Sequence, residues 1–152
     1  VVWYLAATGA RVSELIQIKV EHVEAEYFDL YSKGGKLRRL YIPKILKDET
    51  LKWLEETKVS SGFLFLNRFG ERITTRGISQ QLKKYADKYG INPKVVYPHS
   101  FRHRYAKNFL EKYNDISFLA DLMGHESIET TRIYLRRTAS EQQALVDKIV
   151  TW

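Results

Sequence analysis

The chain has 152 residues and a net charge of +7, with 25 Lys and Arg against 18 Asp and Glu and no cysteine. This length suits one compact domain, and the missing cysteine excludes a disulfide scaffold, a thiolate zinc site and a cysteine nucleophile within it. The apolar stretch at residues 1–7 is too short to span a bilayer and lacks the basic start of a signal peptide. We therefore expect a cytoplasmic protein with no membrane partner, and the positive charge favours a polyanionic partner.

The first half of the sequence predicts short helices around two strands. Residues 1–7 are apolar on every side and predict a buried helix without a capping residue before it, so we expect the chain to be a fragment of a longer protein. Apolar residues at helical spacing predict a second helix over residues 11–18. Residues 27–31 and 37–42 predict an antiparallel hairpin, because the Gly-Gly pair between them can take positive φ at both positions.

The remainder predicts mostly helices. Pro43 starts one helix, and residues 63–66 predict a short strand. Capping residues, prolines and stopping glycines then delimit further helices at residues 74–89, 99–113, 115–123, 127–134 and 140–150. The predicted fold class is therefore α+β, mainly α-helical, with one small antiparallel hairpin.

Two pairs of residues suggest phosphate chemistry. Arg11 and Glu14 stand three apart at a predicted helix start, which fits either a surface ion pair or a guanidinium that a carboxylate orients toward a phosphate. His99 and Arg102 follow Pro98 at another helix N-terminus, where anions are favoured. His99 and His103 are four apart, as metal ligands can be, but no acidic third ligand is near, so we predict no metal and no cofactor.

The last third carries two further candidates. His125 lies in a helix-ending turn and Tyr134 follows nine residues later. Either residue alone is most often structural, and residues 115–134 also fit a helix-turn-helix that enters the DNA major groove.

Taken in order, these motifs resemble the tyrosine recombinases of the phage-integrase family. Residues 8–15, Thr-Gly-Ala-Arg-Val-Ser-Glu-Leu, are similar to the family's first arginine box, and residues 99–103, His-Ser-Phe-Arg-His, match its His-x-x-Arg-His box. Leu-Met-Gly-His at residues 122–125, followed by Tyr134, matches its Leu-Gly-His…Tyr ending. The Ser-Lys-Gly-Gly-Lys turn at residues 32–36 falls where the family has a lysine-bearing hairpin. The resemblance covers residues 1 to about 138.

The resemblance implies a catalytic-core fold and a set of roles. Arg11 and Arg102 would clamp the scissile phosphate. Tyr134 would be the nucleophile that forms a 3′-phosphotyrosyl link, and His99 would accept its proton. Three further residues complete the predicted site: Lys33 as general acid, His125 as a phosphate hydrogen-bond donor, and Glu14 as the carboxylate that orients the cations. Lys36 lies three residues after Lys33 and is the other candidate for general acid.

The implied activity is site-specific DNA recombination by residues 1–152 as a catalytic domain, without the family's N-terminal DNA-clamping domain. The alternatives are a type IB topoisomerase and a non-catalytic DNA-binding module on the same fold. The partner is double-stranded DNA in a prokaryotic cell or mobile element. The additional DNA contacts come from two acid-free clusters of basic residues, which also fit a solvated face: Lys36, Arg38, Arg39 and Arg104.

The final amphipathic helix has Ala144, Leu145 and Ile149 on its apolar face. In the family, the segment after the tyrosine often docks on a neighbouring protomer, which implies a tetramer on DNA. Packing of this face on its own domain is the alternative.

Overall fold

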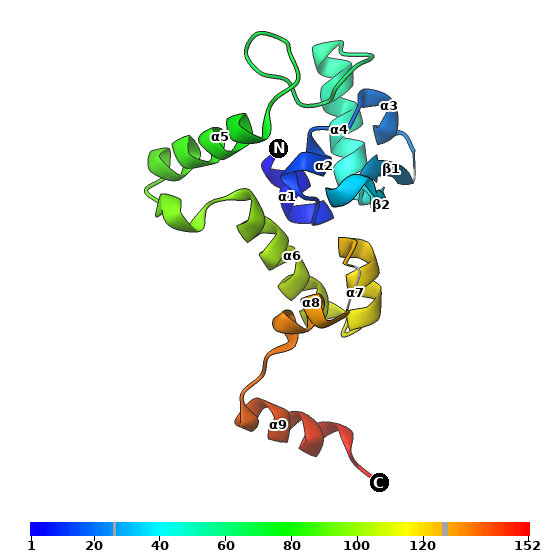
Figure 1. The fold of residues 1–152 in the computed structure, drawn as a ribbon, viewed down its shortest axis with the longest axis vertical. Helices are drawn as coiled ribbons and strands as arrows, with labels where there is room; N and C mark the ends of the chain where they lie inside the picture. The colour runs from blue at the N-terminus through cyan, green and yellow to red at the C-terminus, as the bar shows by residue number, and fades with distance from the viewer. Residues whose placement is uncertain (26, 126–127) are drawn as a thin grey trace.

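The computed structural model describes residues 1–25, 27–125 and 128–152, which form short helices around one two-stranded hairpin (Figure 1). The helices are α1 (Val2–Thr8), α2 (Val12–Leu15), α3 (Val20–Val23), α4 (Lys44–Thr57), α5 (Thr75–Lys88), α6 (Pro98–Lys112), α7 (Ile116–Met123), α8 (Ile128–Arg132) and α9 (Ala139–Ile149). The strands are β1 (Tyr27–Tyr31) and β2 (Leu37–Tyr41). The predicted fold class, mainly helical with one small antiparallel sheet, is confirmed.

The hairpin forms where the two glycines predicted it. Gly34 and Gly35 have φ of 79° and 73°, and β1 pairs antiparallel with β2, so that Leu30 lies opposite Arg38. Side chains alternate between the two faces, which places Arg38 on the buried face together with Leu40. Arg38 is only 6% exposed, so its side chain is not on the solvated face that the sequence analysis considered, and its contact with DNA stays a prediction.

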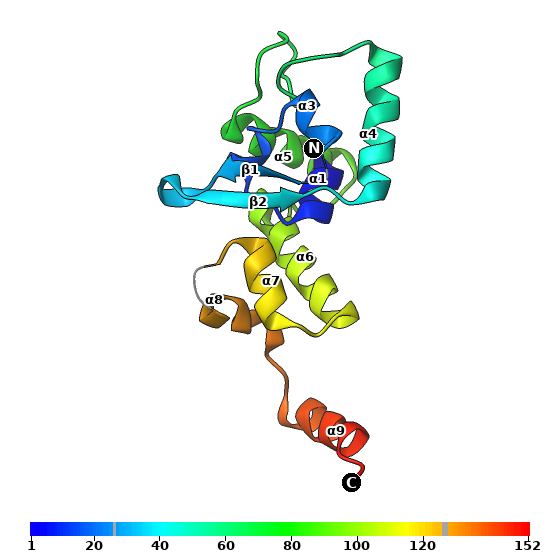
Figure 2. The same ribbon diagram turned by 90° about the vertical axis from the view of Figure 1, so that its right-hand side faces the viewer.

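Two apolar clusters hold the chain together. The larger one joins α1, α2, α4, α5 and the inner face of the hairpin, and its fully buried members include Leu5, Leu15 and Ile78. The smaller one lies between α6 and α7, with Leu119 and Met123 at its centre. Figure 2 shows the first group above and α6, α7 and α8 below it. Because α1 packs against α6, the C-terminal end of α1 faces the second group.

Three predicted elements differ from the structure. Residues 63–66 form no strand; only isolated bridges occur there, Lys19 with Phe63 and Leu66 with Arg72. The helix predicted over residues 11–18 is limited to α2, and α3 follows it. Helix α8 ends at Arg132, so Tyr134 lies in the 3₁₀ turn Ile133–Leu135 rather than in the helix.

Helix α9 stands apart from the rest of the chain. In Figures 1 and 2 an extended segment leads from the 3₁₀ turn to α9 at the far end of the molecule. None of its residues is buried, and Ile149 and Trp152 are 61% and 93% exposed. The apolar face therefore does not pack on its own domain in this structure. Within the described residues, no helix is both long and apolar enough to cross a membrane.

Candidate active site

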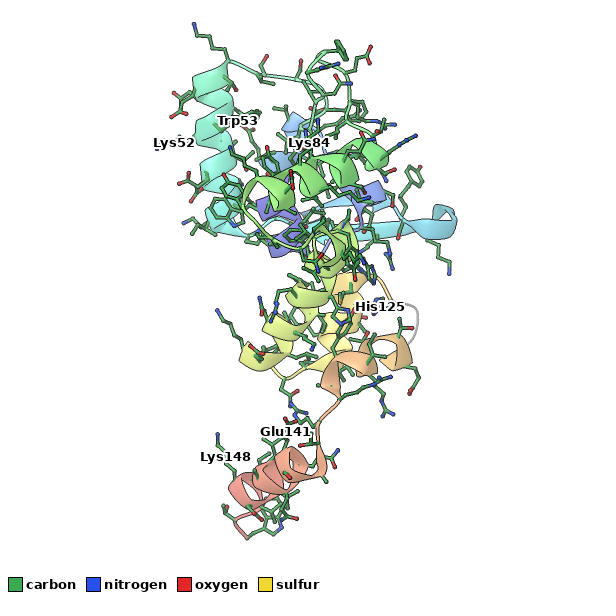
Figure 3. All side chains as sticks on the ribbon, turned by 90° about the vertical axis from the view of Figure 1, so that its left-hand side faces the viewer. Lys52, Trp53, Lys84, His125, Glu141 and Lys148 are labelled. Carbon is green, nitrogen blue, oxygen red and sulfur yellow. The ribbon has the colours of Figure 1, made fainter. Side chains whose placement is uncertain are left out.

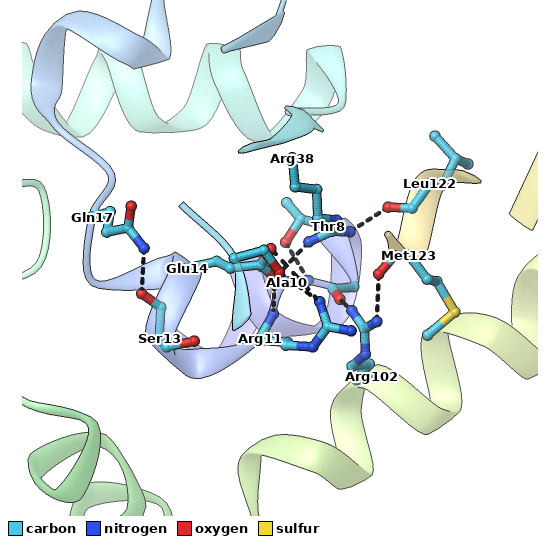
Figure 4. A network of polar contacts seen from close by, with 12 residues as sticks. Thr8, Ala10, Arg11, Ser13, Glu14, Gln17, Arg38, Arg102, Leu122 and Met123 are labelled. Atoms are coloured by element: carbon cyan, nitrogen blue, oxygen red, sulfur yellow. Dashed lines mark hydrogen bonds and ion pairs between the residues drawn. The ribbon is translucent and has the colours of Figure 1, made fainter. Parts of the chain in front are cut away.

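Arg102 lies at the centre of the polar cluster. Pro98 begins α6, and one turn later the side chain of Arg102 is 2% exposed. It donates hydrogen bonds to the backbone carbonyl of Gly9, after α1, and to that of Met123, at the end of α7, the latter at 2.5 Å (Figure 4). Burial, together with the positive charges of Arg11 and Arg38, lowers the pKa of Arg102 to about 10. The guanidinium is still protonated at neutral pH.

Glu14 connects the two other arginines. It is fully buried, and its Oε1 accepts hydrogen bonds from the backbone N–H of Arg11 at 2.7 Å and from Nη1 of Arg38 at 2.6 Å. Its Oε2 lies 3.9 Å from Nη1 of Arg11, which also donates to the hydroxyl of Ser32 at 3.1 Å. Arg11 and Glu14 are therefore no ordinary surface ion pair. Glu14 fixes the start of α2 and thereby the position from which the Arg11 side chain extends.

Arg38 extends this connection to α7. Its Nη2 donates to the carbonyl of Leu122, and the turn after α7 packs on its side chain. A Cβ at Gly124 would lie 2.6 Å from Cδ of Arg38, and Gly124 has φ of +68°. Only glycine fits this position without strain. Arg38 thus ties the hairpin, α2 and the turn before His125 together from inside the protein, a role the sequence analysis missed.

The imidazole of His125 is held on both sides (Figure 3 labels the residue). Its Nε2 lies 3.3 Å from Nη2 of Arg102, and its Nδ1 lies 2.6 Å from the hydroxyl oxygen of the fully buried Thr131. Burial, followed by the charges of Arg102 and Arg11, lowers the pKa of His125 to about 4. The ring is therefore neutral at pH 7. Thr131 was not predicted.

Tyr134 lies beside the same guanidinium. It is half-buried and packs on the smaller apolar cluster, and its ring meets that of His103 edge to face at 4.7 Å. Burial raises the pKa of Tyr134, and the charge of Arg102 acts in the opposite direction. The phenol is therefore protonated in the free protein and needs a proton acceptor to become a nucleophile.

His99 lies in the first turn of α6, one turn before Arg102. Together with Arg11, Tyr97 and Arg102 it lines a cavity of about 390 Å³ between the starts of α2 and α6. Burial, then the charges of Arg102 and its neighbours, lowers the pKa of His99, so the ring is neutral at pH 7. A neutral imidazole can act as a proton acceptor, although the positive charges of Arg102 and Arg11 oppose its protonation while the site holds no anion.

The remaining predicted residues lie on the hairpin and on α6. The side chain of Lys33 is outside the described part of the structure, although its backbone forms the 3₁₀ turn after Ser32. Lys36 is exposed at the start of β2. Arg39 is on the outer face of the hairpin, bonded to Asp29 at 3.2 Å and stacked on Tyr27. Arg104 is exposed on α6.

Within the part of the chain that the structure describes, His99 and His103 have no third metal-ligating side chain beside them. Their ring centroids are 6.5 Å apart, and no group of three metal-ligating side chains occurs among the described residues. The helix-turn-helix alternative is not favoured either. The second helix, α8, has only five residues, and Thr131 on it is buried against His125 rather than presented outward.

Two guanidinium groups, two neutral imidazoles and one phenol come together in one small region, which makes this cluster a candidate phosphate-binding site. The chain belongs to the phage integrase family, whose sequence model matches residues 1–141. It is 36% identical to tyrosine recombinase XerA of Pyrococcus furiosus over 154 residues, which cover 97% of this chain and 53% of that protein. Tyrosine recombinase XerD of Listeria monocytogenes is 35% identical over 143 residues, which cover 88% of this chain and 48% of that one.

Solved structures share the fold. A crystal structure of XerA recombinase matches with a TM-score of 0.77 and 26% identity, over 98% of this chain and 56% of that one. XerH site-specific recombinase bound to its difH substrate matches with a TM-score of 0.74 and 23% identity, over 96% and 44% of the two chains. The chain spans about half the length of the curated relatives it matches.

Proposed function

We propose that this chain is the catalytic domain of a site-specific DNA recombinase that cuts and rejoins strands through a 3′-phosphotyrosyl intermediate. The proposal rests on one observation: Arg102 joins three segments that lie far apart in the sequence. Arg102 on α6 bonds the backbone after α1 and at the end of α7, and it acts on the pKa of Tyr134. A relative with this fold, XerH, is described in complex with its DNA substrate, which supports DNA as the partner here.

The proposed reaction is an in-line displacement at phosphorus. The Tyr134 oxygen attacks the scissile phosphate, a new O–P bond forms, and the bond to the 5′-oxygen breaks. The guanidinium groups of Arg11 and Arg102 stabilise the charge that builds up on the non-bridging oxygens. The energy of the phosphodiester is kept in the covalent link, so the reverse attack by a 5′-hydroxyl rejoins a strand without a nucleotide cofactor.

Two groups transfer protons in this proposal, and a third donates a hydrogen bond to the phosphate. His99 accepts the phenolic proton, since its lowered pKa leaves it neutral at pH 7. Lys33 donates a proton to the leaving 5′-oxygen. His125 donates a hydrogen bond to a non-bridging oxygen, and Glu14 acts on the reaction only by fixing Arg11 and Arg38.

Covalent capture tests this function. The purified chain is mixed with a pool of 40-base-pair duplexes of random sequence, each nicked so that cleavage releases a short fragment and cannot be reversed. Adducts that survive denaturation are isolated, and their DNA is sequenced. The duplex identified in this way is called the captured duplex and serves in the later experiments. We expect an adduct in which the peptide containing Tyr134 carries the DNA; no adduct under any condition would refute the proposal.

The two lysines of the hairpin turn can be distinguished chemically. We expect Lys33→Ala to slow cleavage of the captured duplex by about a hundredfold to ten-thousandfold, because the leaving oxygen loses its proton donor. On a duplex with sulfur in place of the 5′-bridging oxygen, Lys33→Ala should cleave nearly as fast as wild type, since a thiolate leaves without a proton. The measurement is the single-turnover rate of adduct formation on both duplexes.

Lys36→Ala is the matched control in the same turn. We expect it to weaken DNA binding and reduce its salt dependence, with little change in the rate at saturating DNA. Rescue of Lys36→Ala by sulfur, without rescue of Lys33→Ala, would exchange the roles of the two residues.

We further propose that α9 docks on a second copy of the chain, so that copies assemble into a tetramer on DNA. The face with Ala144, Leu145 and Ile149 is not covered by the rest of this chain. An apolar hollow of about 460 Å³, lined by Trp3 and Trp53 among others, lies between α1 and α4. Figure 3 shows Trp53 at the opposite end of the molecule from α9, so a neighbour's α9 is the proposed occupant. Assembly of copies favours a recombinase over a topoisomerase.

The oligomeric state on DNA tests this docking. We expect Leu145→Glu with Ile149→Glu, and separately Trp53→Glu, to abolish tetramers in sedimentation while single duplexes are still cleaved. Gln142→Glu, on the same helix, should leave assembly unchanged. Because the proposed contact runs from the α9 of one copy to the hollow of the next, a mixture of the two defective variants should form dimers. Tetramers of either variant alone would contradict the contact.

A further inference from the structure

The hydrogen bonds around His125 fix where its ring proton lies in the free protein. A guanidinium can only donate, so Nη2 of Arg102 points a proton at Nε2 of His125 across 3.3 Å. Nε2 must then offer its lone pair. The ring is neutral, so its proton lies on Nδ1, which donates to the hydroxyl oxygen of Thr131 at 2.6 Å.

The proposed reaction requires the opposite arrangement. A non-bridging phosphate oxygen is an acceptor, and a bare Nε2 lone pair facing it would be repelled. His125 can hold the phosphate only with the proton on Nε2, and Nδ1 must then accept a hydrogen bond. A hydroxyl group can serve both states, because it accepts from Nδ1–H and, after rotation, donates to a bare Nδ1. A carboxylate or a carbonyl at this place would fix the first state.

We propose that Thr131 is a positioning residue that allows His125 to move its ring proton from Nδ1 to Nε2 when the scissile phosphate enters the site. The inference rests on the proposed function and adds a residue to it. In the exchange, Nδ1 releases a proton to water and Nε2 takes one up, so the net charge does not change. Thr131 is fully buried against His125, which keeps its hydroxyl at the ring whichever tautomer is present.

Substitution of the hydroxyl tests its role. We expect Thr131→Val, which keeps the shape, to slow single-turnover cleavage of the captured duplex about ten- to a hundredfold at unchanged DNA affinity. Thr131→Ser should restore most of the rate. Thr130→Val, at the exposed neighbour, is the matched control and should cleave as wild type does. Equal rates for Thr131→Val and wild type would overturn the inference.

A double substitution separates positioning from a general effect on folding. If Thr131 acts through His125, Thr131→Val should cause no further loss in a His125→Ala background, whereas a purely structural role would give the same fold loss in both backgrounds. If the wild-type chain forms no adduct with any duplex, the proposed function itself fails, and this outcome is distinct from a wild-type adduct that Thr131→Val leaves unaffected.

The tautomer can also be observed directly. In the chain labelled with ¹⁵N at histidine, the His125 signals, identified by their loss in His125→Ala, should show a protonated Nδ1 in the free protein. With the captured duplex bound to Tyr134→Phe, which cannot react, they should show a protonated Nε2. The same protonated nitrogen in both states would overturn the inference.

Discussion

Replacement of Tyr134 by phenylalanine is expected to abolish the covalent adduct, because only the attacking oxygen is removed. The ring remains against His103 and the smaller apolar cluster, so the domain should fold as before. DNA binding should stay within about twofold of wild type, since the proposed phosphate clamp consists of guanidinium groups and not of this hydroxyl. The measurement is adduct on a denaturing gel, together with binding of the captured duplex.

Tyr113→Phe is the control for this experiment. Tyr113 meets Phe109 edge to face at the other end of α6 and is exposed, so loss of its hydroxyl should leave cleavage unchanged. A Tyr134→Phe chain that still forms the adduct would move the nucleophile to another residue.

Arg102→Lys should lower the single-turnover cleavage rate by at least about a hundredfold, although it keeps the positive charge. A lysine has one ammonium group, and it cannot donate to the carbonyls of Gly9 and Met123 and also reach a phosphate. The lost backbone hydrogen bonds should also lower the free energy of unfolding, by roughly 1–3 kcal/mol each. Cleavage and urea unfolding are measured on the same preparation.

Arg104→Lys, on the exposed side of α6, is the matched control and should change neither quantity appreciably. Arg11→Lys separates catalysis from folding, because Arg11 is partly exposed and its guanidinium bonds a side chain rather than the backbone. If both Arg102→Lys and Arg11→Lys cleaved nearly as fast as wild type, the proposal that these two arginines clamp the phosphate would be wrong.

The sequence was sufficient for the helices with clear start and stop signals. Asp115 accepts a hydrogen bond from the N–H of Phe118 at the start of α7, and Gly124 ends it, as predicted. The strand predicted at residues 63–66 failed because a short apolar run does not specify a partner, and only single bridges formed there. Local sequence signals thus predicted the positions of helices, but they could not predict which distant segments pair.

The site residues show the same division. Motif resemblance located Arg11, His99, Arg102, His125 and Tyr134, and the structure brings them to one region. The burial of Arg38 was missed because its charge was considered without the alternation of side chains along the strand, which puts it on the same face as Leu40. Thr131 gave no signal, because its contact with the ring of His125, six residues earlier in the sequence, is a feature of the folded chain alone.

The buried cluster also has an energetic consequence for the whole domain. Arg11, Arg38 and Arg102 share one carboxylate, Glu14, and the first two lower the pKa of the third. The folded chain without a ligand therefore holds more like charge than it neutralises, and this repulsion opposes folding. Under the proposed function, a phosphodiester bound at this cluster would relieve the repulsion, and part of its binding free energy would come from that relief. Occupancy of the site by phosphate and stability of the fold would then be linked.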